Sequence, residues 1–496
     1  MKTPEDETVV LKGQAAVNLW LDGRTAWNKW AAENPNAKVD FAGFDFSDYD
    51  NVFFTGFHFP AGNGDVDFAL TKFGDGVVDF SKTTFGDGVV DFQSVYFSDG
   101  DVNFKNAIFG KGDVTFRYTQ FGDGAVNFFH TTFGGDVDFA LTKFGDGRVD
   151  FSEARFGDGV IYFHGATIGN GDVTFKKAKF GGGGVDFSYV KFGDGVVSFW
   201  VTNFGDGNVD FSGANFGDSD VVFDGTNFGN GNIDFSYATC GMGHFAIKEG
   251  TFGNGKDKSD QKGAITFEHM DFGGRFSFHN CEETGNIQSL SFKGCAFQAG
   301  VTLAAELTCV PDLRGTIVTA HIDLDELQVN SKSRVIEDAP KYRRLKELAE
   351  RNRHHEAALR FFADERRCMR WARGDKPWQT AWSYLGSVLD VIYAGACDYG
   401  RSIAWPVGWL GGLISGSTAV LVNCFKIPLW PDALPMVLTS SIPFLPAGRV
   451  SATEHQWAGD VGHLLPYFEL WYLGHQFFSF ILLFLIGIGL RNRFRL

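Results

Sequence analysis

The chain has 496 residues and a formal net charge of −16, with 54 phenylalanines and 63 glycines. This length is sufficient for several domains. Its seven cysteines are odd in number and form no Cys-x-x-Cys pair, which excludes a disulfide-rich secreted class and predicts free thiols in a reducing compartment. The N-terminal residues MKTPEDETVVLKG lack the apolar stretch of a secretory signal, so no such signal is predicted.

The charge is divided unevenly along the chain. Residues 331–496 contain 20 Lys and Arg against 14 Asp and Glu, a net of +6. The preceding residues hold the other 24 of the 44 basic and 46 of the 60 acidic side chains, so residues 1–330 carry −22. An acidic part joined to a basic part indicates partners of different sign for the two ends.

Residues 1–38 are expected to form an N-terminal helical cap. Residues 25–33 have the pattern of a short helix that ends at Asn34-Pro35. Trp20 and Trp27 supply apolar surface, which the exposed first coil of a stacked β-structure needs as a cover.

A short repeat, V-D-F-S-x-x-x-F-G-D-G, runs from Val66 to Phe235. Phenylalanines recur in it with spacings that alternate between five and seven residues. A fixed short period over such a length predicts a solenoid, in which each repeat packs on its neighbours. The predicted core begins with eight of these side chains: Phe68, Phe73, Phe80, Phe85, Phe92, Phe97, Phe104 and Phe109.

The direction of each side chain follows from the repeat. Side chains alternate along a strand, so Val78 and Phe80 are expected to point into the core while Asp79 between them faces solvent. Thr83 is expected to point inward as well. Residues 86–88, Gly-Asp-Gly, are predicted to turn a corner, because glycine adopts the positive φ that tight corners need.

Val-Asp-Phe-Ser-Gly at 209–213 and Ala-Asn-Phe at 214–216 match the unit of the pentapeptide-repeat family, which is a small or β-branched residue, Asp or Asn, Leu or Phe, and two polar residues. The chain resembles this family over residues 36–330. The resemblance implies a right-handed quadrilateral β-helix, a β-solenoid with one unit on each face. This sequence departs from the family by two extra residues after every second unit, which gives about 24 residues per coil. The solenoid is assigned to residues 39–330, with about 22 motifs in about 11 coils.

Residues 331–400 change to a basic composition with helical spacing, and amphipathic or interfacial helices are expected there. Pro340 suits a first helical turn, and the polar residues 352–355 are expected to divide a helical hairpin. Residues 378–399 form a further helical candidate whose tryptophans and tyrosines suit a membrane interface.

Residues 401–496 are expected to form a two-helix transmembrane hairpin with an intervening loop, 427–466. Residues 404–425 and 470–490 contain no charged side chain, and each stretch is long enough to cross a bilayer. The positive-inside rule then predicts a multi-pass protein of the inner (cytoplasmic) membrane with both termini cytoplasmic. A buried helical hairpin in a soluble domain is the alternative. The basic residues that flank the pair on its outer sides are Arg401, Arg491, Arg493 and Arg495.

Two spans separated by a loop resemble the two-transmembrane pore-loop ion channels, and residues 432–441 lie where such a channel has its pore helix. The chain departs from that family at residues 442–446, which contain no glycine-carbonyl filter, so potassium selectivity is not implied. Polar residues in the second span face either a pore or neighbouring helices. The candidate pore and loop residues are Thr439, Ser440, Ser441, His475, Gln476 and Ser479.

Motifs for catalysis are missing from the sequence. It contains no nucleophile elbow, zinc-protease motif, P-loop or paired Cys-x-x-Cys, so no catalytic residue, metal site or cofactor is expected. The Gly-Asp-Gly corners also suit a calcium-binding β-roll, but one Asp per corner leaves most of the oxygen ligands missing.

These features favour a non-enzymatic, membrane-anchored effector or scaffold. Its expected partners are the lipid bilayer, further copies of the same chain, and a protein that docks on the acidic solenoid; direct nucleic-acid binding is not expected. In this hypothesis the transmembrane hairpins assemble as an oligomer that opens a pore. Two alternatives remain open: a structural membrane scaffold without transport, and an acidic rod that mimics DNA and binds a nucleic-acid enzyme.

Overall fold

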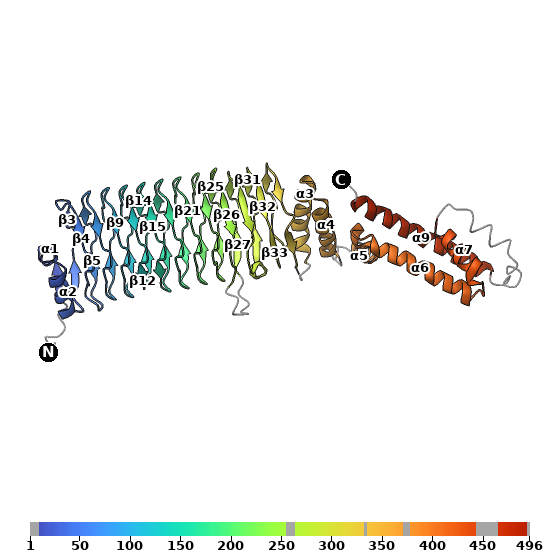
Figure 1. Ribbon diagram of the computed structural model, residues 1–496, viewed down its shortest axis with the longest axis horizontal. Helices are drawn as coiled ribbons and strands as arrows, with labels where there is room; N and C mark the ends of the chain where they lie inside the picture. Colours follow the sequence, from blue (N-terminus) through green and yellow to red (C-terminus); the bar gives the residue numbers. More distant parts are fainter. Residues whose placement is uncertain (1–8, 254–262, 332–334, 371–376, 443–464, 494–496) are drawn as a thin grey trace. The chain divides into compact units, whose positions relative to one another are not determined.

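The computed structural model describes residues 9–253, 263–331, 335–370, 377–442 and 465–493 (Figure 1). The chain divides into two units, residues 1–333 and 334–496. The first unit is a parallel β-solenoid with two helices at its N-terminus, and the second unit is helical. The predicted fold class is confirmed, including the two long apolar helices near the C-terminus.

Two parallel sheets, each of 12 strands, form the main walls of the solenoid (Figure 1). Neighbouring strands come from successive coils, and equivalent residues lie side by side, so that Val66 pairs with Val39 and with Val90. This register follows from the repeat, because an offset of one coil places each residue beside its own equivalent.

The strands of this unit and its short helical turn η1 have the following bounds. The first sheet contains, in spatial order, β1 (Val10–Lys12), β2 (Lys38–Asp40), β5 (Val66–Asp67), β8 (Val90–Asp91), β10 (Val114–Thr115), β13 (Val137–Asp138), β17 (Ile161–Tyr162), β20 (Val185–Asp186), β22 (Val209–Asp210), β24 (Ile233–Asp234), β27 (Ala264–Thr266) and β30 (Ser289–Ser291). The second contains β4 (Val52–Phe53), β7 (Val78–Asp79), β9 (Val102–Asn103), β11 (Val126–Asn127), β15 (Val149–Asp150), β19 (Val173–Thr174), β21 (Val197–Ser198), β23 (Val221–Val222), β26 (Phe245–Lys248), β29 (Phe276–His279), β32 (Val301–Leu303) and β35 (Ile322–Asp323). Four smaller sheets have two strands each: β3 (Asp45–Phe46) with β6 (Lys72–Phe73), β12 (Thr132–Phe133) with β16 (Arg155–Phe156), β14 (Lys143–Phe144) with β18 (Thr167–Ile168), and β33 (Ala305–Leu307) with β36 (Leu327–Val329). A further sheet has four strands, in the order β25 (Thr239–Cys240), β28 (Asp271–Phe272), β31 (Ala296–Phe297) and β34 (Ile317–Val318). The helical turn η1 spans Thr284–Asn286.

The other two sides of each coil are held by these small sheets and by single bridges. Equivalent residues pair there as well, such as Lys72 with Tyr96 and Thr84 with Ile108, so each coil has four sides. The solenoid has about 13 turns, more than the 11 or so expected from the sequence. The sequence count is too low because β1 adds pairing before the first repeat and the last coils have lost the regular Phe and Gly spacing.

Phenylalanine rings fill the solenoid. Phe68 stacks on Phe92 with ring centroids 5.0 Å apart and meets Phe80 edge-on at 5.5 Å. Such pairs contribute roughly 0.5–1.5 kcal/mol each beyond the burial of their surface. Thr83 also points inward, and its hydroxyl donates to the carbonyl of Phe54 at 2.8 Å. The eight core residues expected from the sequence are buried: Phe68, Phe73, Phe80, Phe85, Phe92, Phe97, Phe104 and Phe109.

The Gly-Asp-Gly corners require glycine mainly for close stacking, which corrects the expectation of a positive φ. Gly88 has no positive φ, but a Cβ on it would lie 2.2 Å from the carbonyl oxygen of Gly64 in the preceding coil. At Gly112 the corresponding distance, to the oxygen of Gly88, is 2.0 Å. Successive backbones therefore pass too closely for a side chain. A positive φ is found at later corner glycines such as Gly205.

The alternate corners carry the positive φ instead, often without glycine. Leu70, Tyr118 and Tyr189 have φ values of 62°, 60° and 56°. The aspartate of the V-D-F unit braces such a corner: Asp79 Oδ1 accepts a hydrogen bond from the backbone N–H of Ser81 at 2.7 Å. The sequence predicted only that Asp79 faces solvent. In the structure it is half-buried and also holds the backbone of the corner.

Two helices close the N-terminal end of the solenoid, α1 (Gln14–Leu21) and α2 (Arg24–Glu33). Trp27 of α2 is fully buried and stacks on Phe41 of the first coil with centroids 6.0 Å apart. An apolar end that water would otherwise reach is thereby covered.

The second unit consists of helices and short helical turns. Their bounds are η2 (Ile336–Asp338), α3 (Ala339–Arg351), α4 (His355–Met369), α5 (Pro377–Cys397), η3 (Asp398–Gly400), α6 (Ala404–Asn423), η4 (Leu429–Ala433), α7 (Leu434–Ser440) and α9 (Leu465–Arg493). α3 packs against α4, and the break between them falls within the polar segment expected to divide a hairpin. α6 packs along α9, and α7 contacts both (Figure 1).

α6 and the Leu470–Arg493 part of α9 are long and apolar enough to cross a membrane. The expected loop 427–466 contains η4 and α7, while its residues 443–464 lie outside the described part of the chain. Residues 443–446, which make up most of the segment where a channel filter would follow, are among them. Arg495 also lies outside the described part of the chain.

Replacing Gly112 by alanine is expected to destabilise the solenoid, because the new Cβ would lie 2.0 Å from the carbonyl oxygen of Gly88. The expected loss is about 1–3 kcal/mol in the free energy of unfolding, measured by circular dichroism on the full chain during heating. Gly182→Ala is the matched control at the equivalent corner, where nothing lies within 4 Å of the new Cβ. Equal melting temperatures for the two variants would contradict the close-stacking account.

Candidate functional site

His475 lies in a polar cluster formed by α6, α9 and the end of α7. Its Nδ1 is 2.8 Å from the hydroxyl oxygen of Ser417, and its Nε2 is 2.9 Å from that of Ser441 and 3.4 Å from that of Ser479. Trp471 stacks on the imidazole with ring centroids 5.5 Å apart. Both ring nitrogens therefore have partners inside the chain, as polar groups that join packed membrane helices do.

The structure brings together three of the six candidate pore and loop residues and uses the other three elsewhere. Thr439 and Ser440 donate to backbone carbonyls within α7, at 2.9 Å each. The amide of Gln476 donates to a tyrosine hydroxyl one turn earlier on α9 at 3.0 Å. Ser417 was not predicted from the sequence, because a serine among the small residues of α6 gives no sign of a partner 58 positions away.

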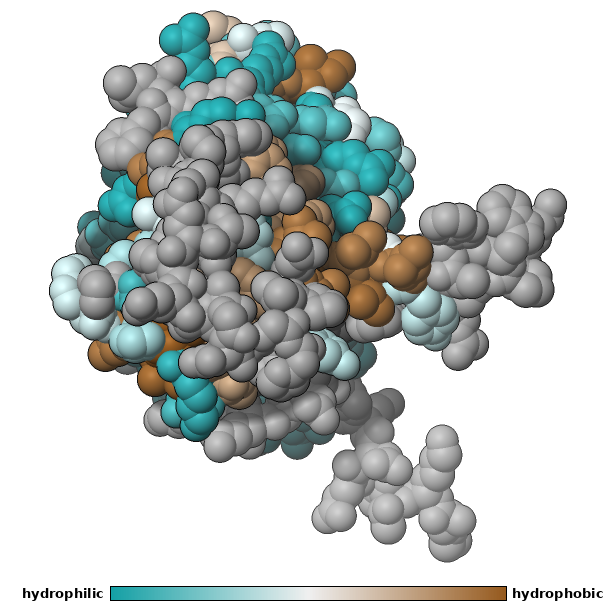
Figure 2. Space-filling model, turned by 90° about the vertical axis from the view of Figure 1, so that its right-hand side faces the viewer, coloured by the Kyte–Doolittle hydropathy of each residue, from teal (hydrophilic) through white to brown (hydrophobic). Residues whose placement is uncertain are grey.

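α6 and α9 leave most of their apolar surface exposed. In each helix only 22% of the most apolar window is buried. Exposed side chains include Trp405 and Trp409 on α6 and Phe477 and Phe484 on α9. Figure 2 shows apolar side chains, in brown, at the surface of the face that it draws. A soluble protein normally buries a helix of this composition, so these surfaces fit a lipid environment better than water.

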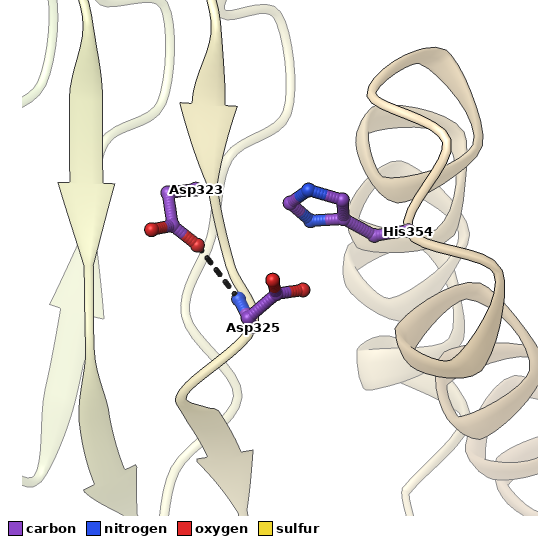
Figure 3. A group of neighbouring side chains, drawn as sticks. All are labelled: Asp323, Asp325 and His354. Atoms are coloured by element: carbon purple, nitrogen blue, oxygen red, sulfur yellow. Dashed lines mark hydrogen bonds between the residues drawn. The ribbon is translucent and has the colours of Figure 1, made fainter.

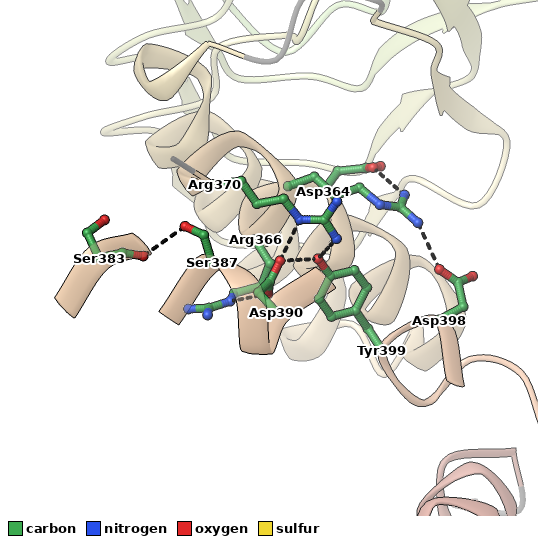
Figure 4. Close-up of polar contacts among 9 residues, drawn as sticks. Asp364, Arg366, Arg370, Ser383, Ser387, Asp390, Asp398 and Tyr399 are labelled. Carbon is green, nitrogen blue, oxygen red and sulfur yellow. Dashed lines mark hydrogen bonds and ion pairs between the residues drawn. The ribbon is translucent and has the colours of Figure 1, made fainter. Parts of the chain in front are cut away.

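A charged network joins α4, α5 and η3 (Figure 4). Asp390 accepts hydrogen bonds from Arg370 Nε at 2.6 Å, from Arg366 Nε at 3.2 Å and from the hydroxyl of Tyr399 at 2.7 Å. Arg370 Nη2 also donates to the Tyr399 oxygen at 2.6 Å. Asp390 and Tyr399 are buried, so their polar atoms depend on these partners.

This network shifts the pKa of its members. Burial raises the pKa of Tyr399 from 10.0 to about 12, and the hydrogen bond to Asp390 adds to the rise. Burial by itself would raise the pKa of Asp390, but hydrogen bonds from Arg370, Tyr399 and Arg366 bring it below its ordinary value of 3.8. The stabilisation linked to Tyr399 is therefore present below pH 10 and lost as the pH rises through about 12. The stabilisation linked to Asp390 is present above pH 3.8 and lost as the pH falls through the lowered pKa.

This network was not predicted from the sequence. Its one signal is that Asp390 is the single charged residue in the 21 residues of α5, at Pro377–Cys397. The arginines that pair with it are Arg366 of α4 and Arg370, which directly follows that helix.

A column of exposed apolar side chains follows one corner of the solenoid, and we call it the exposed column. Tyr189 and Tyr237 are 62% and 68% exposed. Glycine takes the equivalent position at Gly165 and Gly213. A bulky side chain at positive φ costs strain that glycine avoids, and most of the surface of these two tyrosines stays exposed. The members of the column are Leu70, Tyr118, Leu141, Tyr189 and Tyr237.

The corner aspartates use a carboxylate oxygen to hold backbone. Asp87 Oδ1 accepts a hydrogen bond from the N–H of Lys111 in the next coil at 3.0 Å. Near the end of the solenoid Asp323 Oδ1 accepts from the N–H of Asp325 at 3.1 Å (Figure 3). These bonds support a structural role for the repeated aspartates over calcium binding.

No family model, curated protein or solved structure matches this chain. The resemblance to the pentapeptide-repeat family therefore stays a prediction, although the four-sided β-solenoid agrees with what it implies.

Replacing Asp390 by alanine is expected to destabilise the helical unit by about 3 kcal/mol, because it leaves two arginines beside an empty buried position. The measurement is thermal unfolding of the full chain in detergent at pH 7. Glu347→Ala is the control, since it removes an exposed ion pair with Arg344 in the same unit and should change stability by less than about 1 kcal/mol. Equal losses of stability in the Asp390 and Glu347 variants would contradict the proposed contribution of the network to the stability of the helical unit.

Tyr399→Phe should reduce the loss of stability that the unmodified chain shows between pH 10 and about 12, because the ionising hydroxyl is removed.

Proposed function

We propose that this chain is a non-enzymatic, membrane-anchored scaffold or effector, related to pentapeptide-repeat proteins, whose solenoid docks a protein partner. The observation that carries the proposal is the exposure of α6 and α9. Their apolar windows have mean hydropathies of 1.3 and 1.9, yet only 22% of each is buried. Lipid is the solvent that suits such a pair, and a bilayer anchor follows.

The distribution of basic residues supports one orientation of the anchor. Arg401 precedes α6, and Arg491 and Arg493 end α9, so the cationic ends of both helices lie on the same side of the hairpin. By the positive-inside rule this side is cytoplasmic. We therefore place the chain in the inner membrane of a bacterial cell as a multi-pass protein, with both termini and the solenoid in the cytoplasm.

The exposed column supports the docking role of the solenoid. Aromatic side chains with a polar tip are enriched at protein interfaces, and Tyr189 and Tyr237 present such side chains to solvent. Asp186 and Asp210 lie on the adjoining strands β20 and β22. A protein partner with apolar contacts and a basic surface fits this combination of tyrosine and carboxylate.

The polar cluster around His475 bears on the second part of the hypothesis, the pore. Its hydroxyl and imidazole groups are paired with one another inside one chain. This pairing favours a scaffold whose helices pack through the cluster, and it makes conduction the second candidate function. Both candidates require the chain to insert in a membrane, but a pore also needs several hairpins around an axis.

The mass of the detergent-extracted complex tests these proposals together. The expected result is a homo-oligomer with additional mass from a bound protein partner. Tyr189→Asn with Tyr237→Asn should remove that additional mass and leave the subunit number unchanged, because asparagine tolerates positive φ and the fold is retained. Lys82→Asn, at a positive-φ position of a different corner, is the control.

A monomeric mass without partner would contradict the assembly and docking parts of the proposal. Leakage of a dye from vesicles that contain the oligomer would favour the effector with a pore, and tight vesicles would favour the scaffold without transport.

A further inference from the structure

A cavity of about 550 Å³ opens in the helical unit where α6 begins and α9 ends. Its walls come from the first turns of α4, the segment between η3 and α6, and the last turn of α9. Gly489 of α9 makes the approach possible, since a Cβ on it would lie 3.0 Å from Ile403 Cγ1. The polar residues that line the cavity include His355, Glu356, Arg401, Ser402, Asn492 and Arg493.

The position of this cavity along the helices is informative. Arg401 precedes the first residue of α6, and Arg493 is the last residue of α9. The cavity is therefore at one end of both apolar helices, beside the exposed Trp405. In a chain anchored as proposed above, this is the depth at which phospholipid headgroups lie, and tryptophan is common there.

The charges of the walls show what the cavity accepts. Among the described residues no ion pair joins Arg493 to an acidic side chain, and its side chain is exposed. Arg401 Nη1 is 3.4 Å from Asp398 Oδ2, and Asp398 also receives a 2.8 Å hydrogen bond from Arg367, which is paired with Asp364 at 2.9 Å as well. Each guanidinium group has five N–H donors, so Arg401 and Arg493 retain donors for a phosphate. Two carboxylates, those of Glu356 and Asp398, line the cavity as well.

We propose that this cavity binds the phosphate headgroup of a membrane phospholipid, with Arg401 and Arg493 holding the phosphate. The inference rests on the membrane anchorage proposed above. Basic pockets at the cytoplasmic ends of membrane helices have the chemistry that such headgroups need. A lipid bound here contacts α4, α6 and α9 at once, and so couples the basic helices to the anchor.

Native mass spectrometry of the full chain in detergent, after removal of co-purified lipid, tests the site. The probes are phosphatidylglycerol, phosphatidylethanolamine and inorganic phosphate, each titrated separately. We expect one phospholipid per chain to bind at the lowest lipid concentrations, and Arg401→Gln with Arg493→Gln to weaken it about 10- to 30-fold. Arg351→Gln with Lys426→Gln removes the same charge away from the cavity and should change the affinity less than about twofold.

Arg401→Lys with Arg493→Lys retains the charge and should recover most of the binding, which distinguishes headgroup contact from a loss of folding. Equal lipid affinity in the Gln pair and the unmodified chain would overturn the proposal, and so would inorganic phosphate that binds as tightly as lipid. Preference for phosphatidylethanolamine would assign Glu356 to the ammonium group, and preference for phosphatidylglycerol would assign the site to the arginines alone. Failure of the chain to enter membranes would instead overturn the proposed function itself.

Discussion

Each coil of the solenoid packs its residues on the same residues of the coil before it, and the whole first unit depends on this stacking. The ring of Phe116 lies between those of Phe92 and Phe139, at 4.8 Å from each. Backbone at the glycine corners approaches so closely that the carbonyl of one coil occupies the space of a Cβ in the next. A side chain that fails to fit disturbs two neighbours at once, which explains why the repeat is so regular.

This regularity is also why the sequence predicts the first unit well. The alternating spacing of the phenylalanines fixes which residues are buried, because position and side-chain direction repeat together. The corners were predicted less well. A positive φ was expected at the Gly-Asp-Gly corners, whereas that conformation falls mostly at the alternate corners, at residues such as Leu70 and Tyr118. Spacing does not distinguish a glycine chosen for its φ from one chosen for close approach.

In the helical unit the sequence predicts the helices but not the contacts between them. The sequence predicts α5 as an aromatic interfacial helix, and nothing near Asp390 in the sequence indicates that it pairs with Arg366 of α4 and with Arg370 just after it. Ser417 and His475 likewise meet only because α6 packs on α9. Polar groups with distant partners have no local signature, so only the structure reveals such sites.

Two buried polar groups of the helical unit are paired, while both units leave selected apolar side chains exposed. The carboxylate of Asp390 and the imidazole of His475 are paired with partners inside the chain. The tyrosines of the exposed column and the outer surfaces of α6 and α9 are not covered in the described structure. A protein partner and a lipid bilayer are the proposed covers, and the cavity at Arg401 and Arg493 is the proposed contact with lipid headgroups.

Labelling of Cys424 tests the central claim, membrane anchorage with a cytoplasmic solenoid, most directly. Cys424 is exposed and follows the end of α6 opposite to Arg401. In cells with a permeabilised outer membrane, a membrane-impermeant maleimide should label Cys424, whereas a cysteine placed at the exposed Lys191 of the solenoid should react only after lysis. Labelling of both positions from outside, or of neither before lysis, would contradict the account.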